Sequence, residues 1–240
     1  MLVAVHHVDS LRQPSVQMKF IRIASIAAIC ALVPLTVSGQ TIRSPDMNLE
    51  FHRAKAALKS GGSLLEAKTR LDRVLDAGPT DTDAYVLRSR VQLALKRHPD
   101  ALSDARRAAE LDSVSGEVQF VLCQAARAAG DTTVALQALQ KASSTIEADP
   151  LKHIVLSREA MLLGQFDTSE SLARVAVALD GTNPEAHYQL ARALALDGKK
   201  DAAVQILSRG IDEGRLSADY VSQDPVFDST GIGAMLISGD

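Results

Sequence analysis

Residues 183–212 read NPEAHYQLARALALDGKKDAAVQILSRGID, a pattern typical of two helices. Asn183 can cap a helix that begins at Pro184, because a proline at the first helical position has no backbone N–H to leave unbonded. Gly198 can take the positive φ that ends a helix, and apolar residues then recur at helical spacing from Asp201 to Asp212. The segment therefore predicts two helices joined by a tight turn.

A column of glycines indicates that this helix pair recurs every 34 residues. The column consists of Gly62, Gly130, Gly164 and Gly198, with Lys96 at the remaining position. Two more columns hold mostly small residues: Lys55, Ser89, Cys123, Ser157 and Ala191, and Ala67, Ala101, Ala135, Ser169 and Ala203. The predicted units are 48–81, 82–115, 116–149, 150–183 and 184–217, preceded by a linker at 40–47 and followed by a C-terminal cap and flexible tail at 218–240.

This repeat resembles that of the tetratricopeptide repeat family, a helix–turn–helix unit of the same length with small residues in both helices and glycine in the turn. The last unit matches best, through Tyr188, Leu190, Ala191, Leu194, Gly198, Ala203 and Leu207. The chain departs from the family pattern at Lys55, in a small column, and at Gln119, His153 and His187, in place of an aromatic residue. The resemblance implies an all-α fold, an α-solenoid of five helix–turn–helix repeats wound as a right-handed superhelix.

The composition agrees with a helical fold. The chain has 240 residues, of which 46% are apolar and only 3% aromatic, with no Trp. Sheets are enriched in aromatic and β-branched residues, whereas alanine and leucine suit closely packed helices. The net charge of −3 argues against a general nucleic-acid binder, because phosphate contacts need a surplus of basic residues.

The segment 1–39 has the features of a signal peptide with an upstream leader. Lys19 and Arg22 precede an apolar run from Ile23 to Val37, and small residues follow at a cleavage point. Because the run would span roughly 22 Å as a helix, it is short for a hydrocarbon core of roughly 30 Å. We therefore expect an exported chain, periplasmic or secreted; the alternative is a chain anchored by an uncleaved N-terminal helix.

No catalytic or cofactor motif accompanies the repeats. The sequence lacks a glycine-rich phosphate loop, His-Glu-x-x-His and Gly-x-Ser-x-Gly, so we expect no enzyme, cofactor, metal site or small-molecule substrate. Cys123 stands in a small column and is expected to be a packed, unreactive thiol. His153 and His187 share position 4 of successive units, and packing explains them better than a metal site, which needs a third ligand.

The first helices carry the candidate binding residues. By the family resemblance, positions 2, 5, 9 and 12 of each unit face a concave groove, and this spacing puts them on one helix face. The predicted peptide-binding residues are Val86, Arg90, Phe120, Gln124, Arg127, Ile154, Arg158, Tyr188 and Arg192. Four arginines beside an apolar stripe predict an extended partner with acidic and apolar side chains. The alternative is that arginine on a solvated helix is only a good helix former.

These patterns lead to one expected function and one alternative. We expect a non-catalytic protein–protein interaction scaffold or adaptor of the cell envelope, which binds an extended peptide or a partner protein in the groove. The alternative is a membrane-tethered structural component of an envelope assembly that keeps the N-terminal apolar segment. A mature N-terminus at Gln40 would exclude the tether.

Overall fold

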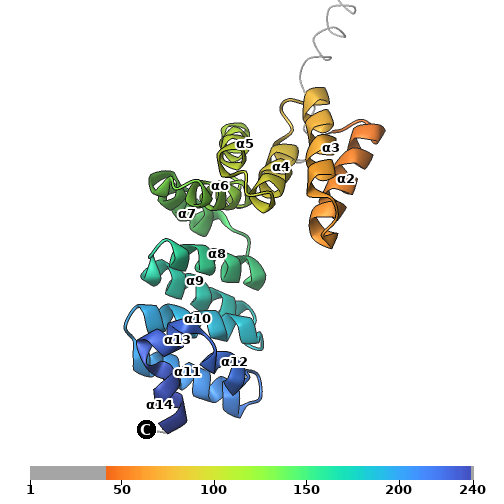
Figure 1. Cartoon of the computed structure of the whole chain (residues 1–240). Helices are drawn as coiled ribbons and strands as arrows, with labels where there is room; N and C mark the ends of the chain where they lie inside the picture. Colours follow the sequence, from red (N-terminus) through yellow and green to blue (C-terminus); the bar gives the residue numbers. More distant parts are fainter. Residues whose placement is uncertain (1–41, 239–240) are drawn as a thin grey trace, which may run out of the picture. The chain divides into compact units, whose positions relative to one another are not determined.

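The computed structural model describes residues 42–238, a range that contains helices and no strand (Figure 1). All of these helices lie in one compact unit, Arg43–Asp240. The all-α prediction is confirmed for this range, and within it no helix combines the length and hydropathy needed to cross a membrane. The predicted signal peptide, residues 1–39, lies outside the described residues.

The described helices form consecutive antiparallel pairs, one pair for each predicted unit. The pairs are α2 (Pro45–Ser60) with α3 (Leu64–Ala77), α4 (Thr82–Ala94) with α5 (His98–Leu111), α6 (Gly116–Ala128) with α7 (Thr132–Thr145), α8 (Pro150–Leu162) with α9 (Phe166–Leu179), and α10 (Pro184–Leu196) with α11 (Lys200–Asp212). Three short helices follow: α12 (Ala218–Ser222), α13 (Pro225–Thr230) and α14 (Ile232–Ser238).

Polar side chains fix where the first helices begin. The Ser115 hydroxyl accepts a hydrogen bond from the Val118 N–H, and the side-chain oxygens of Asp149 and Asn183 accept from first-turn N–H groups in the same way. Pro184 occupies the first position of α10, as predicted. These bonds satisfy N–H groups that have no partner within the helix, so each unit starts at a defined residue.

The glycine column ends the first helices of the third, fourth and fifth units. Gly130, Gly164 and Gly198 have φ of +82°, +71° and +78°. Lys96 stands at the same place in the second unit and has φ of +58°, the left-handed region that a residue with a Cβ adopts only at a cost. The turn therefore imposes its backbone conformation even where glycine is absent.

The first unit departs from the predicted register by one residue. Gly61, and not Gly62, has the positive φ, of +71°. Ala54 is fully buried whereas Lys55 is exposed, so Ala54 takes the small position that the sequence had placed at Lys55. Phe51 is likewise buried in place of His52 at position 5. The prediction was wrong here because two adjacent glycines fit the turn equally well, and the packing of α2 chooses between them.

The small columns bring the two helices of a unit into close contact. The Ser89 hydroxyl, on α4, donates a hydrogen bond to the Ala101 carbonyl oxygen of α5 at 2.8 Å. In the fourth unit, the Ser157 hydroxyl donates to the Ser169 carbonyl oxygen at 2.9 Å. All four side chains are fully buried. Only small residues let two helix backbones approach closely enough for a hydroxyl on one to reach a carbonyl on the other.

The short C-terminal helices cover the end of the fifth unit. Val221, Phe227 and Ile232 are buried among side chains of α10 and α11. The Tyr188 hydroxyl donates a hydrogen bond to Asp224 at 2.5 Å. The tail from 231 onward was expected to be flexible or loosely packed, but 232–238 form α14 because Ile232 is buried in this cluster.

Candidate functional site

First helices of successive units lie side by side, α4 against α6 and α8 against α10. We call the surface that they form the first-helix face. It carries the residues at positions 2, 9 and 12 and the buried carboxylate of the fourth unit: Arg90, Glu117, Gln124, Arg127, Leu151, Arg158, Glu159, Glu185 and Arg192. This face contains the polar part of the predicted peptide-binding set.

The apolar part of that set is largely covered, although Phe120 and Tyr188 each line a hollow. Val86, Ile154 and Tyr188 are buried, and Phe120 is half-buried. Val86 packs among α5 and α6, and Ile154 packs against Ala176 and Ala186. Position 5 is covered because the next unit, or for Tyr188 the C-terminal helices, lies directly on it.

The arginines of the first-helix face are paired with carboxylates. Arg90 lies 2.8 Å from Glu117, and Arg158 lies 2.9 Å from Glu185. In both pairs the acid stands 27 residues after the arginine, so position 9 of one unit meets position 2 of the next. These inter-unit ion pairs neutralise charges that the sequence had assigned to an acidic partner.

The other two arginines are paired as well. Arg127 Nε donates to the Glu159 carboxylate at 2.7 Å. Arg192 Nε lies 3.0 Å from the Asp224 carboxylate, at an ion-pair distance but without hydrogen-bond geometry. Asp224 belongs to the C-terminal segment, which therefore supplies the acid that a further unit would supply.

The junction between the third and fourth units lacks the ion pair between position 9 of one unit and position 2 of the next. The positions that hold arginine and glutamate elsewhere are Gln124 and Leu151, and Leu151 is 61% exposed. Gln124 instead donates to Glu159 at 3.0 Å, beside Arg127. Glu159 is only 5% exposed and takes a position that is Val91, Ala125 or Ala193 in other units.

A cavity of about 450 Å³ opens at this junction. Its apolar lining comes from the α5–α6 turn, α6, the α7–α8 connection and α8: Val114, Phe120, Ile146, Leu151 and Val155. Arg90, Glu117, Glu147 and Lys152 add charged groups. The sequence analysis identified Arg90 and Phe120 but missed the other lining residues. Two of them had a signal in the sequence: Leu151 replaces a glutamate found in neighbouring units, and Ile146 replaces an aspartate or glycine.

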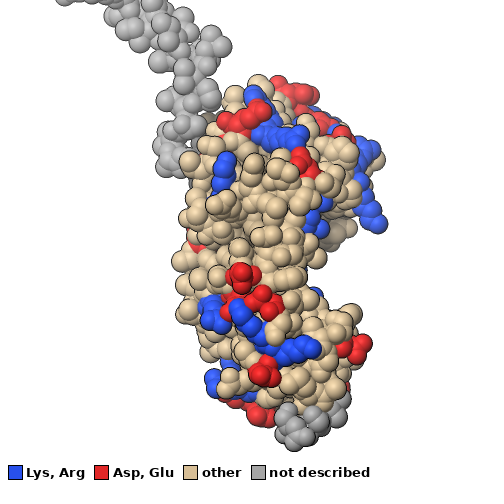
Figure 2. All heavy atoms as spheres, turned by 90° about the vertical axis from the view of Figure 1, so that its left-hand side faces the viewer, with Lys and Arg blue, Asp and Glu red and all other residues tan. Residues whose placement is uncertain are grey.

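Two further hollows lie along the first-helix face. One, of about 570 Å³, lies among Arg90, Leu93, His98, Gln124, Arg127 and Ala128. The other, of about 440 Å³, is lined by Arg158, Glu185, Tyr188, Gln189, Arg192, Tyr220, Gln223, Asp224 and Pro225. Figure 2 shows basic and acidic side chains next to one another in an upper and a lower group, with a broad uncharged area between the two groups.

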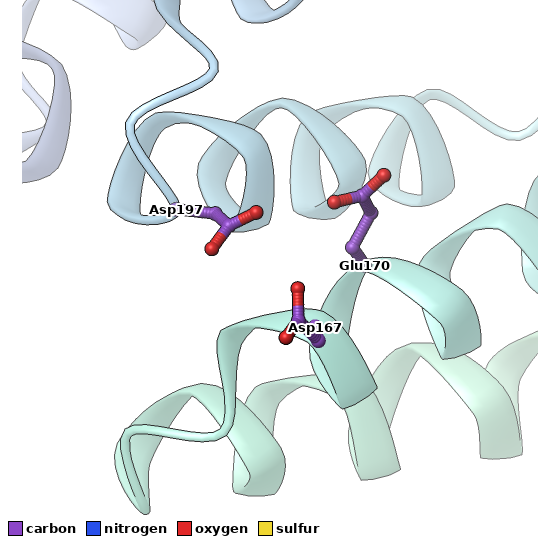
Figure 3. Close-up of side chains that lie close together, drawn as sticks. All are labelled: Asp167, Glu170 and Asp197. Carbon is purple, nitrogen blue, oxygen red and sulfur yellow. The ribbon is translucent and has the colours of Figure 1, made fainter.

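Three carboxylates on another part of the fourth and fifth units converge as metal ligands would. Asp167 and Glu170 project from α9 toward Asp197 at the end of α10 (Figure 3), and their oxygens lie within 4.8 Å of one another. However, Lys199 Nζ lies 2.6 Å from Asp197 and 2.7 Å from Glu170. These hydrogen bonds raise the pKa of Lys199, so an ammonium group already pairs with two of the three carboxylates.

Packing and hydrogen bonds within the protein account for Cys123, His153 and His187. Cys123 is fully buried, and this burial, followed by the nearby Glu159 charge, raises the pKa of its thiol to about 12. The His153 ring is bonded through Nδ1 to the Asp149 carbonyl oxygen at 2.9 Å, and the His187 ring is bonded to a carbonyl in its own preceding turn. Cys123 is therefore packed as expected. Its thiol stays protonated near neutral pH, and a protonated thiol is a poor nucleophile.

Comparison with known proteins identifies related folds. Two models of the tetratricopeptide repeat match this chain, over residues 51–116 and 160–222. MamA from Desulfovibrio magneticus RS-1 is 16% identical, covering 76% of this chain and 99% of that chain, with a TM-score of 0.58. PilW, described as a widely conserved type IV pilus biogenesis factor, is 17% identical over 82% of this chain and 91% of that chain, with a TM-score of 0.64.

A third solved structure is YrrB, described as a tetratricopeptide repeat protein with an unusual peptide-binding site. It is 18% identical, covering 68% of this chain and 84% of that chain, with a TM-score of 0.53. At these identities the likeness to solved structures concerns the fold alone. A search of curated proteins gave no match.

Proposed function

This chain belongs to the tetratricopeptide repeat family, and from this membership we propose that it is a non-catalytic scaffold of the cell envelope which binds a segment of a partner protein along its first-helix face. Proteins built from these repeats generally serve as scaffolds for protein–protein contacts. The proposal adds to that general role a location in the cell and a binding surface.

One observation carries the proposal: hollows follow one another along the first helices. The cavity at the third junction adjoins Arg90, which also lines the hollow around Gln124, and the hollow beside Arg158 lies farther along. A row of concave sites along parallel helices suits an extended segment that places successive side chains in them. Aromatic and aliphatic side chains in such hollows commonly dominate binding energies.

The paired arginines change the expected chemistry of the partner. Arg90 and Arg158 are partly exposed but each lies within 3 Å of a carboxylate, so little positive charge remains for an acidic ligand. Exposed ion pairs of this kind contribute about 0–1 kcal/mol, so replacing the present carboxylate by one from a ligand would gain little free energy. We therefore expect apolar contacts, more than acidic side chains, to select the partner.

Photo-crosslinking in the native cell tests the binding surface. A benzophenone amino acid placed at Phe120, Gln124 or Arg158 should form covalent adducts with a partner protein, which mass spectrometry then identifies. The matched controls are Val175 and Leu179 on α9, which are exposed but lie on a second helix. Equal labelling from α9, or no adduct from any first-helix position, would reject the proposed surface.

The location in the envelope has its own test. The proposal expects export directed by residues 1–39, with a mature chain that begins at Gln40. Mass spectrometry of the protein isolated from its host gives the mature N-terminus. An intact chain in the membrane fraction would instead favour a tethered component of an envelope assembly, and an intact chain in the cytoplasm would reject an envelope role.

A further inference from the structure

We propose that the cavity between the third and fourth units is an anchor pocket for one or two large uncharged side chains, aliphatic or aromatic, from a segment of the partner protein. This inference rests on the proposed function and specifies which chemistry the first-helix face selects. It follows from four features of this junction, the first two of which depart from the pattern of the other junctions.

The first feature is an exchange of polarity between two positions of α8. Leu151 stands where Glu117 and Glu185 form inter-unit ion pairs, and it exposes 61% of its surface. Glu159 stands in an otherwise apolar column and is 5% exposed. An exposed leucine and a buried glutamate both depart from the usual polarity of their positions, and such departures from local rules are typical of functional sites.

The second feature is the connection between α7 and α8. After α3, α5 and α9, the helix-capping residues Gly78, Asp112 and Asp180 have φ between −144° and −141° and ψ between 80° and 91°. Ile146 occupies this position after α7 and has φ of −68° and ψ of 139°. The α7–α8 connection therefore begins with a backbone conformation that differs from that of the other three.

Side-chain hydrogen bonds hold this backbone at two of the three other connections, and Gly78 adopts it without one. The Asp112 carboxylate accepts hydrogen bonds from Val114 and Ser115 N–H groups, and Asp180 accepts from Thr182 N–H in the same way. These bonds close the turn that brings the next unit close. The Ile146 side chain has no hydrogen-bond acceptor to form such a turn. In addition, α7 and α8 contact each other less extensively than α5 and α6 or α9 and α10 do.

The third feature is the size and lining of the resulting space. The cavity of about 450 Å³ falls within the usual range for small-ligand pockets, so it is large enough for one or two side chains. Val114 and Leu151 line it and are 77% and 61% exposed. Covering them with an apolar side chain would remove apolar surface from water, at about 25 cal/mol per Å².

The fourth feature is the charge around the opening, which decides the class of occupant. Arg90 lies 2.8 Å from Glu117 on one side, and Lys152 lies 2.6 Å from Glu147 on the other. The two basic and two acidic groups balance, so neither an acidic nor a basic anchor gains a net attraction. A polar rim around an apolar centre is the usual anatomy of an interface hot spot.

Selection of binding peptides tests the pocket. A library of random peptides displayed on phage is selected against the full-length protein, and synthetic copies of the enriched peptides are then titrated by fluorescence anisotropy. We expect a consensus with Leu, Ile or Phe and no net charge. Its affinity should change by less than about twofold between about 50 and 500 mM salt, because screening acts on charges and not on apolar contacts.

A double variant closes the pocket without removing the fold. Gln124→Arg with Leu151→Glu installs the residues of the neighbouring junctions and should weaken the selected peptides by about tenfold or more. Leu65→Glu is the matched control, since Leu65 is 60% exposed but lies on α3 outside the pocket. Circular dichroism and the unfolding temperature verify that both variants fold.

Several outcomes would overturn the inference. These are an acidic, salt-dependent consensus, equal binding to the double variant, and failure to enrich any apolar peptide. Concentration-dependent dimers of the wild type that the double variant abolishes would show that a second copy covers the patch instead. Photo-crosslinks in the cell from Arg158, which lies outside the pocket, would still stand in each case, so this inference can fail without the proposed function.

Discussion

Replacing Lys96 by glycine is expected to stabilise the protein. Lys96 has φ of +58° at the turn where the third, fourth and fifth units have glycines with φ between +71° and +82°. In this region the Cβ of an L-residue crowds the following carbonyl oxygen. The Lys96 side chain is exposed, so removing it costs little packing.

The expected gain follows from two opposing terms. A residue with a Cβ in the left-handed region is strained by about 1–2 kcal/mol. Glycine loses more backbone entropy on folding, which costs about 0.5–1 kcal/mol. The difference predicts that Lys96→Gly raises the free energy of unfolding by about 0.5–1 kcal/mol. Gly164→Ala and Gly198→Ala should lower it by a similar amount, because an added Cβ meets no atom within 4 Å and only the backbone strain remains.

Urea unfolding followed by far-ultraviolet circular dichroism measures these changes. Lys96→Ala is the matched control, since alanine keeps a Cβ in the same strained conformation and should leave the free energy of unfolding nearly unchanged. The dependence on urea concentration should not change among the variants. A destabilising Lys96→Gly, or an equal gain from Lys96→Ala, would refute the assignment of strain to this turn.

Tyr188→Phe should lower the free energy of unfolding by about 1–3 kcal/mol in chemical denaturation, because it removes the hydroxyl that donates to the buried Asp224 carboxylate. Burial, and then this hydrogen bond, raise the pKa of Tyr188 above its usual 10.0, so the difference from wild type should be constant below about pH 10 and shrink at higher pH. Cys123, with a pKa raised to about 12 by burial, should react with iodoacetamide near pH 8 only in denaturant, as mass spectrometry would detect. Lys199→Ala should lower the unfolding temperature in a fluorimetric melt, less so at high salt, because Glu170 and Asp197 would then repel each other.

The fold is largely predictable from sequence because each unit repeats the same local instructions. Asn183 with Pro184 starts a helix and Gly198 ends it, and the structure confirms both. The register of α2 is less accessible, since Gly61 and Gly62 both permit the turn. Burial of Phe51 decides between them, and burial depends on contacts with the next unit.

The candidate site is less predictable because exposure depends on neighbouring units. Helical spacing correctly assigns Arg90 and Arg158 to one face, but it does not reveal that the following unit covers Ile154. The carboxylate partners were within reach of sequence reasoning, because Glu117 and Glu185 follow their arginines by the same 27 residues. A column-by-column comparison would also have shown that Leu151 stands at the position where the neighbouring units have a glutamate.

The third junction is held together by a different contact, and this difference explains how a pocket can open there. Glu159 lies eight residues after Leu151, which is about 12 Å along α8. Its buried carboxylate accepts hydrogen bonds from Arg127 and Gln124 of α6 at 2.7 and 3.0 Å. A buried charge with two donors is far more costly to separate than an exposed ion pair. The polar contact between α6 and α8 therefore lies farther along α8, and the cavity lies beside the N-terminal ends of the two helices, where we expect an apolar side chain to enter.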